Sequence, residues 1–148
     1  MRILGIDYGR KRIGLAISDP LCITAQGLPT LHRRDLAHDM EVLARIIREW
    51  EVDEIVVGLP KKMDDTLGEG AQEVLAFVEE LKRRLLLTVY LVDERLSTVR
   101  AHRAMKEGGL SRKKRTERAD KISAQLILQN YLDQKGRKSR EGEDNKKF

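Results

Sequence analysis

The order of hydrophobic patterns along the chain constrains its fold more than any other feature. Alternating apolar residues predict two short strands at 3–7 and 13–18, joined by a turn, and a third extended segment within 22–31. A strand meander followed by right-handed crossovers gives a mixed five-stranded α/β sheet with helices on both faces. The later elements of that sheet are expected as helices at 35–50, 74–85, 97–109 and 117–132, with strands at 54–58 and 88–93.

The size and composition of the chain predict one domain without a membrane span. The 148 residues, 41% of them apolar, suit a single core over residues 1–134. Nine of the last fourteen residues are charged, so residues 135–148 are expected to form a disordered charged tail. The run 85–92 is shorter than the roughly 20 apolar residues of a membrane helix, and no signal-peptide core precedes Asp7. With Cys22 as the single cysteine, we expect a cytoplasmic protein.

Basic residues are concentrated in the last third of the chain. Residues 1–99 carry a formal net charge of −3, whereas residues 100–148 carry +8. Clustered Lys and Arg side chains neutralise phosphates and release counterions, so the asymmetry favours nucleic acid as the partner. A solvated basic surface is the alternative explanation.

Three acidic positions lie where core-building residues would be expected. Asp7 ends the first strand among small residues, which leave room for a phosphate or a hydrated metal ion; its alternative role is to order the turn. Asp93 and Glu94 end the fifth strand, and strand alternation sends their side chains to opposite faces, so only one of them joins Asp7. Asp120 begins an apolar helical stripe, where a contact with the helix dipole is the alternative.

Three carboxylates gathered in one partly buried site would repel one another unless cations offset their charge. Oxygen ligands suit Mg²⁺ or Mn²⁺, and a pair of such ions about 4 Å apart can activate water for phosphodiester cleavage. The histidines lack zinc-ligand spacing, and neither glycine-rich nucleotide-binding motif is present. The sequence therefore favours a two-metal nuclease over other hydrolases.

Several motifs, in one order, resemble a known family. The chain is similar to the YqgF family, whose members are described as candidate nucleases of pre-16S rRNA and as Holliday-junction-resolvase-like proteins. The resemblance covers roughly residues 1–134 and rests on GIDYG at 5–9, RIGLAISD at 12–19, VVGLP at 56–60, DERLST at 93–98, and Asp120 with ILQNYL at 127–132.

The resemblance implies an RNase H-like fold and a set of catalytic acids. Asp7, Glu94 and Asp120 match the acids of the family motifs, which implies that these three hold the catalytic metals and that Glu94 rather than Asp93 joins the site. Related resolvases carry a fourth acid, for which Glu117 is the nearest candidate, although a glutamate at a helix start is common.

The expected function is that of a metal-dependent nuclease at the 5′ end of pre-16S rRNA. A resolvase-like nuclease on branched DNA and a non-catalytic rRNA- or junction-binding module are the alternatives, and the protein is expected to be a monomer or a homodimer. An actin-like ATPase would need a second domain that this chain has no room for. The side chains expected to position phosphates are those of Arg10, Lys11, Arg12, Arg112, Lys113, Lys114 and Arg115.

Overall fold

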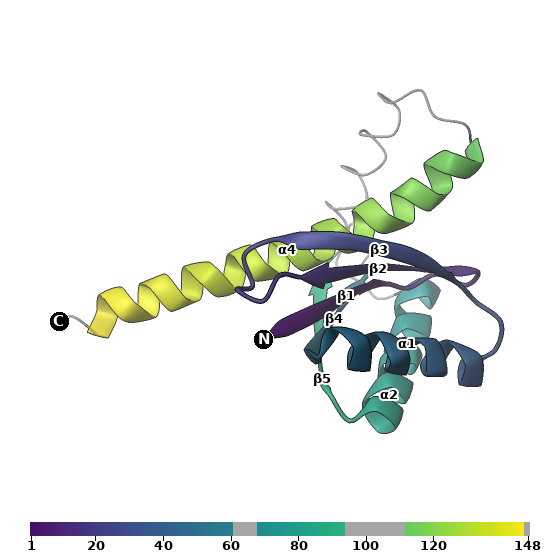
Figure 1. The fold of residues 1–148 in the computed structure, drawn as a ribbon, viewed down its shortest axis with the longest axis horizontal. Coiled ribbons are helices and arrows are strands. Elements are labelled where there is room, and N and C mark those ends of the chain that lie inside the picture. Colours follow the sequence, from purple (N-terminus) through teal and green to yellow (C-terminus); the bar gives the residue numbers. More distant parts are fainter. Residues whose placement is uncertain (61–67, 94–111, 147–148) are drawn as a thin grey trace.

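The protein folds into one five-stranded mixed sheet between two helical layers, as the hydrophobic patterns predict (Figure 1). A computed structural model describes residues 1–60, 68–93 and 112–146. The strand order is β3-β2-β1-β4-β5; β1 to β3 are antiparallel neighbours, and β4 and β5 run parallel to β1. The elements are β1 (Arg2–Asp7), β2 (Arg12–Ser18), β3 (Ala25–His32), α1 (Leu36–Trp50), β4 (Val52–Leu59), α2 (Glu69–Leu85), β5 (Thr88–Asp93) and α4 (Arg112–Lys146).

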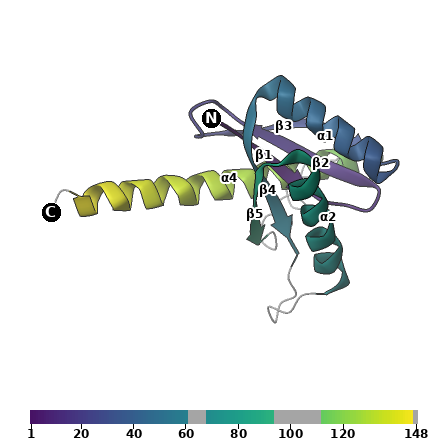
Figure 2. The same ribbon diagram turned by 90° about the horizontal axis from the view of Figure 1, so that it is seen from below.

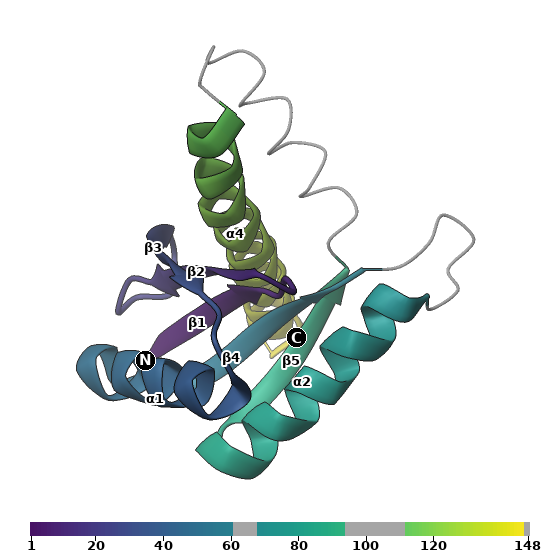
Figure 3. The same ribbon diagram turned by 90° about the vertical axis from the view of Figure 1, so that its right-hand side faces the viewer.

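Strand alternation divides the core into two layers. On one face, Leu4 and Ile6 of β1 belong to a large apolar cluster that α1 and α2 cover. On the other face, Ile3 belongs to a smaller cluster that α4 covers with Ile127 and Leu128. Figure 3 shows α1 and α2 on one side of the sheet and α4 on the other. Asp7 follows Ile3 and Gly5 at the period of two, so it belongs to the face that α4 covers.

Helix α1 begins and ends where its local sequence predicts. The Asp35 side chain accepts a hydrogen bond of 2.8 Å from the backbone N–H of His38, which satisfies one of the helix's first donors. At the other end, Glu51 adopts a left-handed conformation, with φ of 52°, and its N–H donates to the carbonyl of Arg48. The chain then turns directly into β4, which pairs beside β1.

Small residues let α4 lie close to the sheet. A Cβ atom built on Gly5 would be 2.8 Å from Cβ of Leu128, and one on Gly14 would be 2.2 Å from the carbonyl oxygen of Asp120. Neither glycine has a positive φ, so the glycines are needed here for close approach and not for an unusual backbone conformation. The part of α4 from Asp120 to Leu128 is therefore held against β1 and β2.

The last helix is longer than the sequence predicts. Helicity was expected for 117–132 with disorder from 135, but α4 runs from Arg112 to Lys146. The structure therefore differs from the predicted disordered segment through Lys146. Once the docked part of α4 has formed, each further residue adds one backbone hydrogen bond, so the helix extends without a new nucleation step. Figures 1 and 2 show the C-terminal half of α4 projecting away from the sheet.

Two further sequence expectations concern a short helix and a membrane span. The short helix expected over 97–109 lies outside the described residues. Within the described part of the chain, no helix combines the length and the apolar character needed to cross a membrane.

Candidate active site

The first acid of the candidate site lies at the end of a central strand. Asp7 is the last residue of β1 and pairs in register with Gly14 of β2. The turn that follows is tight, because a Cβ atom on Gly9 would be 2.4 Å from the carbonyl oxygen of Arg12. This end of β1 is also the end toward which the parallel strands β4 and β5 run. The carboxyl ends of three strands therefore meet at one edge of the sheet.

Helix α4 brings the second acid to the same place. The backbone of Asp120 rests on Gly14, the residue that pairs with Asp7, so Gly14 is the common neighbour of both acids. The Asp120 side chain is 21% exposed and accepts a hydrogen bond of 2.9 Å at Oδ2 from Nε of Arg12. Two acids separated by more than a hundred residues in sequence are thus brought together on one face of the sheet.

The third expected acid cannot be placed, but its neighbour can. Glu94 lies outside the described residues. Along β5, Val92 packs into the cluster under α4, whereas Val89 packs into the cluster under α1 and α2. Asp93 therefore belongs to the face opposite Asp7. This leaves Asp93 poorly placed to join Asp7 and Asp120.

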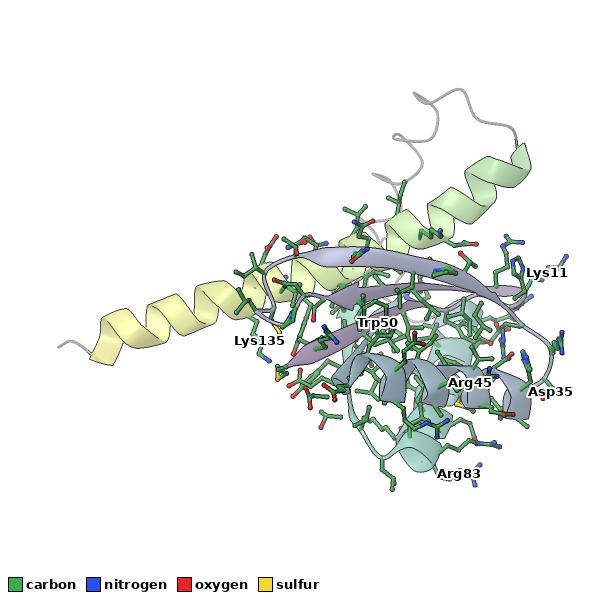
Figure 4. The ribbon with its side chains drawn as sticks, in the orientation of Figure 1. Lys11, Asp35, Arg45, Trp50, Arg83 and Lys135 are labelled. Atoms are coloured by element: carbon green, nitrogen blue, oxygen red, sulfur yellow. The ribbon has the colours of Figure 1, made fainter. Side chains whose placement is uncertain are left out.

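The basic residues of the first turn have different surroundings. Arg10 donates from Nε and Nη2 to the carboxylate of Glu73 on α2, at 2.9 and 2.6 Å. Lys11 is exposed at the tip of the turn, at one end of the sheet, while Lys135 lies at the other end (Figure 4). Arg12 pairs with Asp120. The backbone of Arg112, Lys113, Lys114, Arg115 and Glu117 forms the first turns of α4, and the placement of their side chains lies outside the described part.

A buried charged network beneath this turn was not predicted from the sequence. Nε of Arg33 donates to Oδ2 of Asp39 at 2.9 Å, and its Nη1 donates to the hydroxyl of Tyr8 at 2.9 Å. The same guanidinium lies 4.9 Å from the centroid of the Tyr8 ring and 5.6 Å from that of Phe77. The network ties the turn after Asp7 to α1 and α2.

The protonation states of this network follow from its contacts. Asp39 is fully buried, and this burial, the largest single effect on its pKa, disfavours the ionised form. Hydrogen bonds from Arg33, from the backbone N–H of Arg34 and from His38 together outweigh the burial, so the pKa of Asp39 is lowered. Burial likewise disfavours the charged form of Arg33, but its bonds to Asp39 and Tyr8 leave its pKa raised. Both groups are therefore charged at neutral pH. No sequence pattern signalled them, since an Arg before a helix and an Asp in its first turn, such as Arg33 and Asp39, are usually surface residues.

The acids of the site suit a hard cation. Among the described residues, no three acidic, histidine or cysteine side chains lie close enough together to hold a metal ion. Asp7 pairs in register with Gly14 and the backbone of Asp120 rests on Gly14, so β1 and α4 nonetheless bring two carboxylic acids to the same end of the sheet. Carboxylate oxygens are the donors that Mg²⁺ or Mn²⁺ prefers. The residues present therefore fit such an ion, with Glu94 as the expected further ligand.

Solved structures share this fold. T. thermophilus RuvC bound to a Holliday junction substrate superposes with a TM-score of 0.55 at 16% identity, over 89% of this chain and 93% of that one. The fowlpox virus resolvase bound to Holliday junction DNA gives 0.55 at 12% identity, over 90% and 98% of the two chains. The chain therefore has the same mixed α/β fold as these two resolvases.

Sequence comparison narrows the class to a family. The chain belongs to the family described as "RuvX: Holliday junction resolvase", whose profile matches residues 1–134, and the family resemblance of the motifs is thereby confirmed. A Clostridium novyi protein named "Putative pre-16S rRNA nuclease" is 50% identical over 133 residues, covering 90% of this chain and 98% of the relative. A protein of the same name from Clostridium botulinum strain Hall is 51% identical, covering 90% and 97%.

Proposed function

We propose that this chain is a metal-dependent phosphodiesterase that cleaves structured nucleic acid, and that its reaction is the processing of the 5′ end of pre-16S rRNA. One observation carries the proposal. Asp7 and Asp120, from the first strand and the last helix, share Gly14 as their neighbour at the end of the central strands. Two carboxylates close together repel one another unless a cation or a basic group offsets their charge.

The comparisons support the same reaction. The relatives named as pre-16S rRNA nucleases match nearly their whole length at about half identity, so the site region is covered in full. The excess of basic residues after residue 99 suits an RNA substrate. Ribosome assembly would place the protein in the cytoplasm.

The acids of the site would act as metal ligands. Asp7, Glu94 and Asp120 would hold one or two Mg²⁺ or Mn²⁺ ions, with Glu117 as a candidate fourth acid. When bound, such ions lower the pKa of water and stabilise charge on the leaving oxygen. The buried pair of Arg33 and Asp39 keeps the turn after Asp7 rigid, which favours a fixed geometry for the acids.

Phosphate contacts would come from the turn that contains Lys11 and from the start of α4. Lys11 is exposed and available to a phosphate, whereas Arg10 and Arg12 would first have to leave Glu73 and Asp120. Arg112, Lys113, Lys114 and Arg115 would extend this basic surface along the start of α4. Such contacts position a backbone and read little sequence.

Cleavage of an end-labelled substrate panel tests the proposal. The panel contains a pre-16S rRNA leader, plain single strands and a four-way DNA junction, each with Mg²⁺, Mn²⁺ or EDTA. We expect the leader to be cut only when a metal is present. Asp7→Asn and Glu94→Gln should each lower the rate by at least about 100-fold, because losing a metal ligand costs more than losing a residue that only hydrogen-bonds to a ligand. Asp93→Asn is the matched control, because its side chain belongs to the other face of the sheet, and it should keep most of the activity.

The outcomes separate the candidate functions. Cutting of the junction in preference to the leader would favour a resolvase-like DNA nuclease, which the family's description supports. Binding without cutting under every condition would contradict the nuclease proposal and favour a binding module. Full activity in Asp7→Asn would remove Asp7 from the mechanism.

A further inference from the structure

The contact between Arg12 and Asp120 joins a basic residue to an acid of the candidate site. Arg12 opens β2, and its Nε donates to Oδ2 of Asp120 at 2.9 Å. The two side chains are only 34% and 21% exposed, so the pair is partly shielded from water. A charge-assisted hydrogen bond of this length is among the stronger polar contacts in proteins.

The other two cations of the same turn are placed differently. Arg10 is 71% exposed, and it is directed to Glu73 on α2. Lys11 is exposed, and its backbone carbonyl accepts a hydrogen bond of 2.9 Å from the N–H of Arg33. Within the described residues, Arg12 is thus the turn cation that pairs with a carboxylate proposed to bind metal. Arg12 lies two residues before Gly14 on β2 and pairs in register with His32 of β3.

We infer that Arg12 is the resident counter-ion of Asp120, so that a divalent cation reaches this carboxylate in competition with the guanidinium. The inference rests on the proposed function, because it concerns the same acids. Arg12 offsets the charge of Asp120 when no metal is bound, which lets two acids lie near one glycine without a cation. The same contact occupies Oδ2 and places a positive charge beside the ligand, and both effects weaken metal binding.

This arrangement couples the metal to the nucleic acid. A phosphate that takes the Arg12 guanidinium releases Asp120, and a metal ion that takes Asp120 releases Arg12 for a phosphate. Such coupling is reciprocal, so each partner raises the affinity for the other by the same factor. The protein would then hold metal most tightly when its substrate is present.

Direct measurement of Mn²⁺ binding tests the inference without any cleavage assay. Electron paramagnetic resonance reports free aqueous Mn²⁺, so the Kd is obtained by titrating Mn²⁺ into the protein without nucleic acid. Arg12→Gln removes the charge and keeps a side chain of similar polarity. We expect its Kd for Mn²⁺ to fall about fivefold, the factor that corresponds to about 1 kcal/mol for a partly exposed ion pair.

Two control variants separate local from general effects. Lys11→Gln removes the same formal charge one residue away and should leave the Kd for Mn²⁺ within about twofold of wild type, since it does not contact the carboxylate. Arg12→Lys keeps the charge and should stay close to wild type. Circular dichroism confirms that each variant is folded.

The outcomes distinguish this inference from the proposed function. If Asp7→Asn abolishes Mn²⁺ binding and Arg12→Gln binds as wild type does, the counter-ion inference is wrong while the metal site stands. Equal tightening by Lys11→Gln and Arg12→Gln would also overturn the inference, because the effect would then reflect net charge alone. If neither wild type nor Arg12→Gln binds Mn²⁺, both the inference and the proposed metal-dependent function are contradicted.

Discussion

Replacing Gly14 by alanine tests how the site is assembled. The added Cβ would lie 2.2 Å from the carbonyl oxygen of Asp120 and 2.8 Å from its carbonyl carbon. Real Cβ atoms essentially never come closer than 3.0 Å to such atoms, and the obstacle is backbone, which cannot rotate away. Helix α4 must therefore move outward by about 1 Å, a gap that forfeits a quarter to a half of each contact it loosens.

The expected magnitude follows from what α4 buries. Its docked part carries Ala124, Ile127, Leu128 and Leu132, all at most 3% exposed. Overpacking costs about 1–3 kcal/mol, and we expect about 3 kcal/mol here because the helix backbone is displaced. For a chain of this size that corresponds to a fall in Tm of about 10 °C. The shift of Asp120 should also lower any cleavage activity by about 100-fold.

Urea and thermal unfolding of a glycine series give the measurement, with Gly27→Ala as the matched control. Gly27 lies on β3 under the same helix, but its Cβ would be 3.5 Å from Cβ of Lys121, an ordinary contact. We expect Gly27→Ala to remain within about 0.5 kcal/mol of wild type. Gly5→Ala, at 2.8 Å from Cβ of Leu128, should fall between the two. Equal stability of Gly14→Ala and Gly27→Ala would refute the close approach of α4 to β2.

Two further predictions concern ionisation. Because the pKa of Asp39 is lowered in the folded protein, its ion pair with Arg33 contributes stability above the unfolded value of about 4 and loses it as the pH falls through the folded value. Asp39→Asn should therefore cost about 3 kcal/mol at pH 7 and less at pH 3, measured by urea unfolding at both pH values. A cost that is the same at both pH values would contradict this assignment. Burial, followed by the charge of Glu54, raises the pKa of Tyr131 to about 12, so this tyrosine should ionise last in an ultraviolet titration of the folded protein. Because the unfolded chain releases this proton near pH 10, the folded state should lose stability above about pH 10. Tyr131→Phe should remove that last step, and a step that persists in the variant would assign it to another tyrosine.

The sheet and its layers were predictable because each element carries its own local signal. Alternation along 3–7 and 13–18 marks buried strands, and the N-cap at Asp35 marks the start of α1. The extent of α4 was not predictable in the same way. Its last part is stabilised by continuity with a docked helix, and the composition of 135–148 contains no trace of that docking.

The candidate site was predictable only in part, for a physical reason. Asp7 and Asp120 were singled out because acids interrupt apolar patterns, and that signal is local. The pairing of Arg12 with Asp120 joins residues 108 positions apart, and the contact depends on how α4 lies across β2. The network of Arg33 and Asp39 likewise depends on the packing of the turn against α2. Neither contact changes the residue pattern of its own segment.

The two acids are carried by the first and the last of the elements that the structure describes, so they are synthesised at different times. Asp7 is synthesised with β1, whereas Asp120 is added only when α4 is synthesised. A nascent chain that ends before α4 exposes Ile3, Ala16 and Val56, which α4 covers in the complete protein. Docking of α4 therefore covers this apolar face and brings Asp120 close to Asp7 in the same step. A chain that lacks α4 has neither a covered apolar face nor both acids of the site.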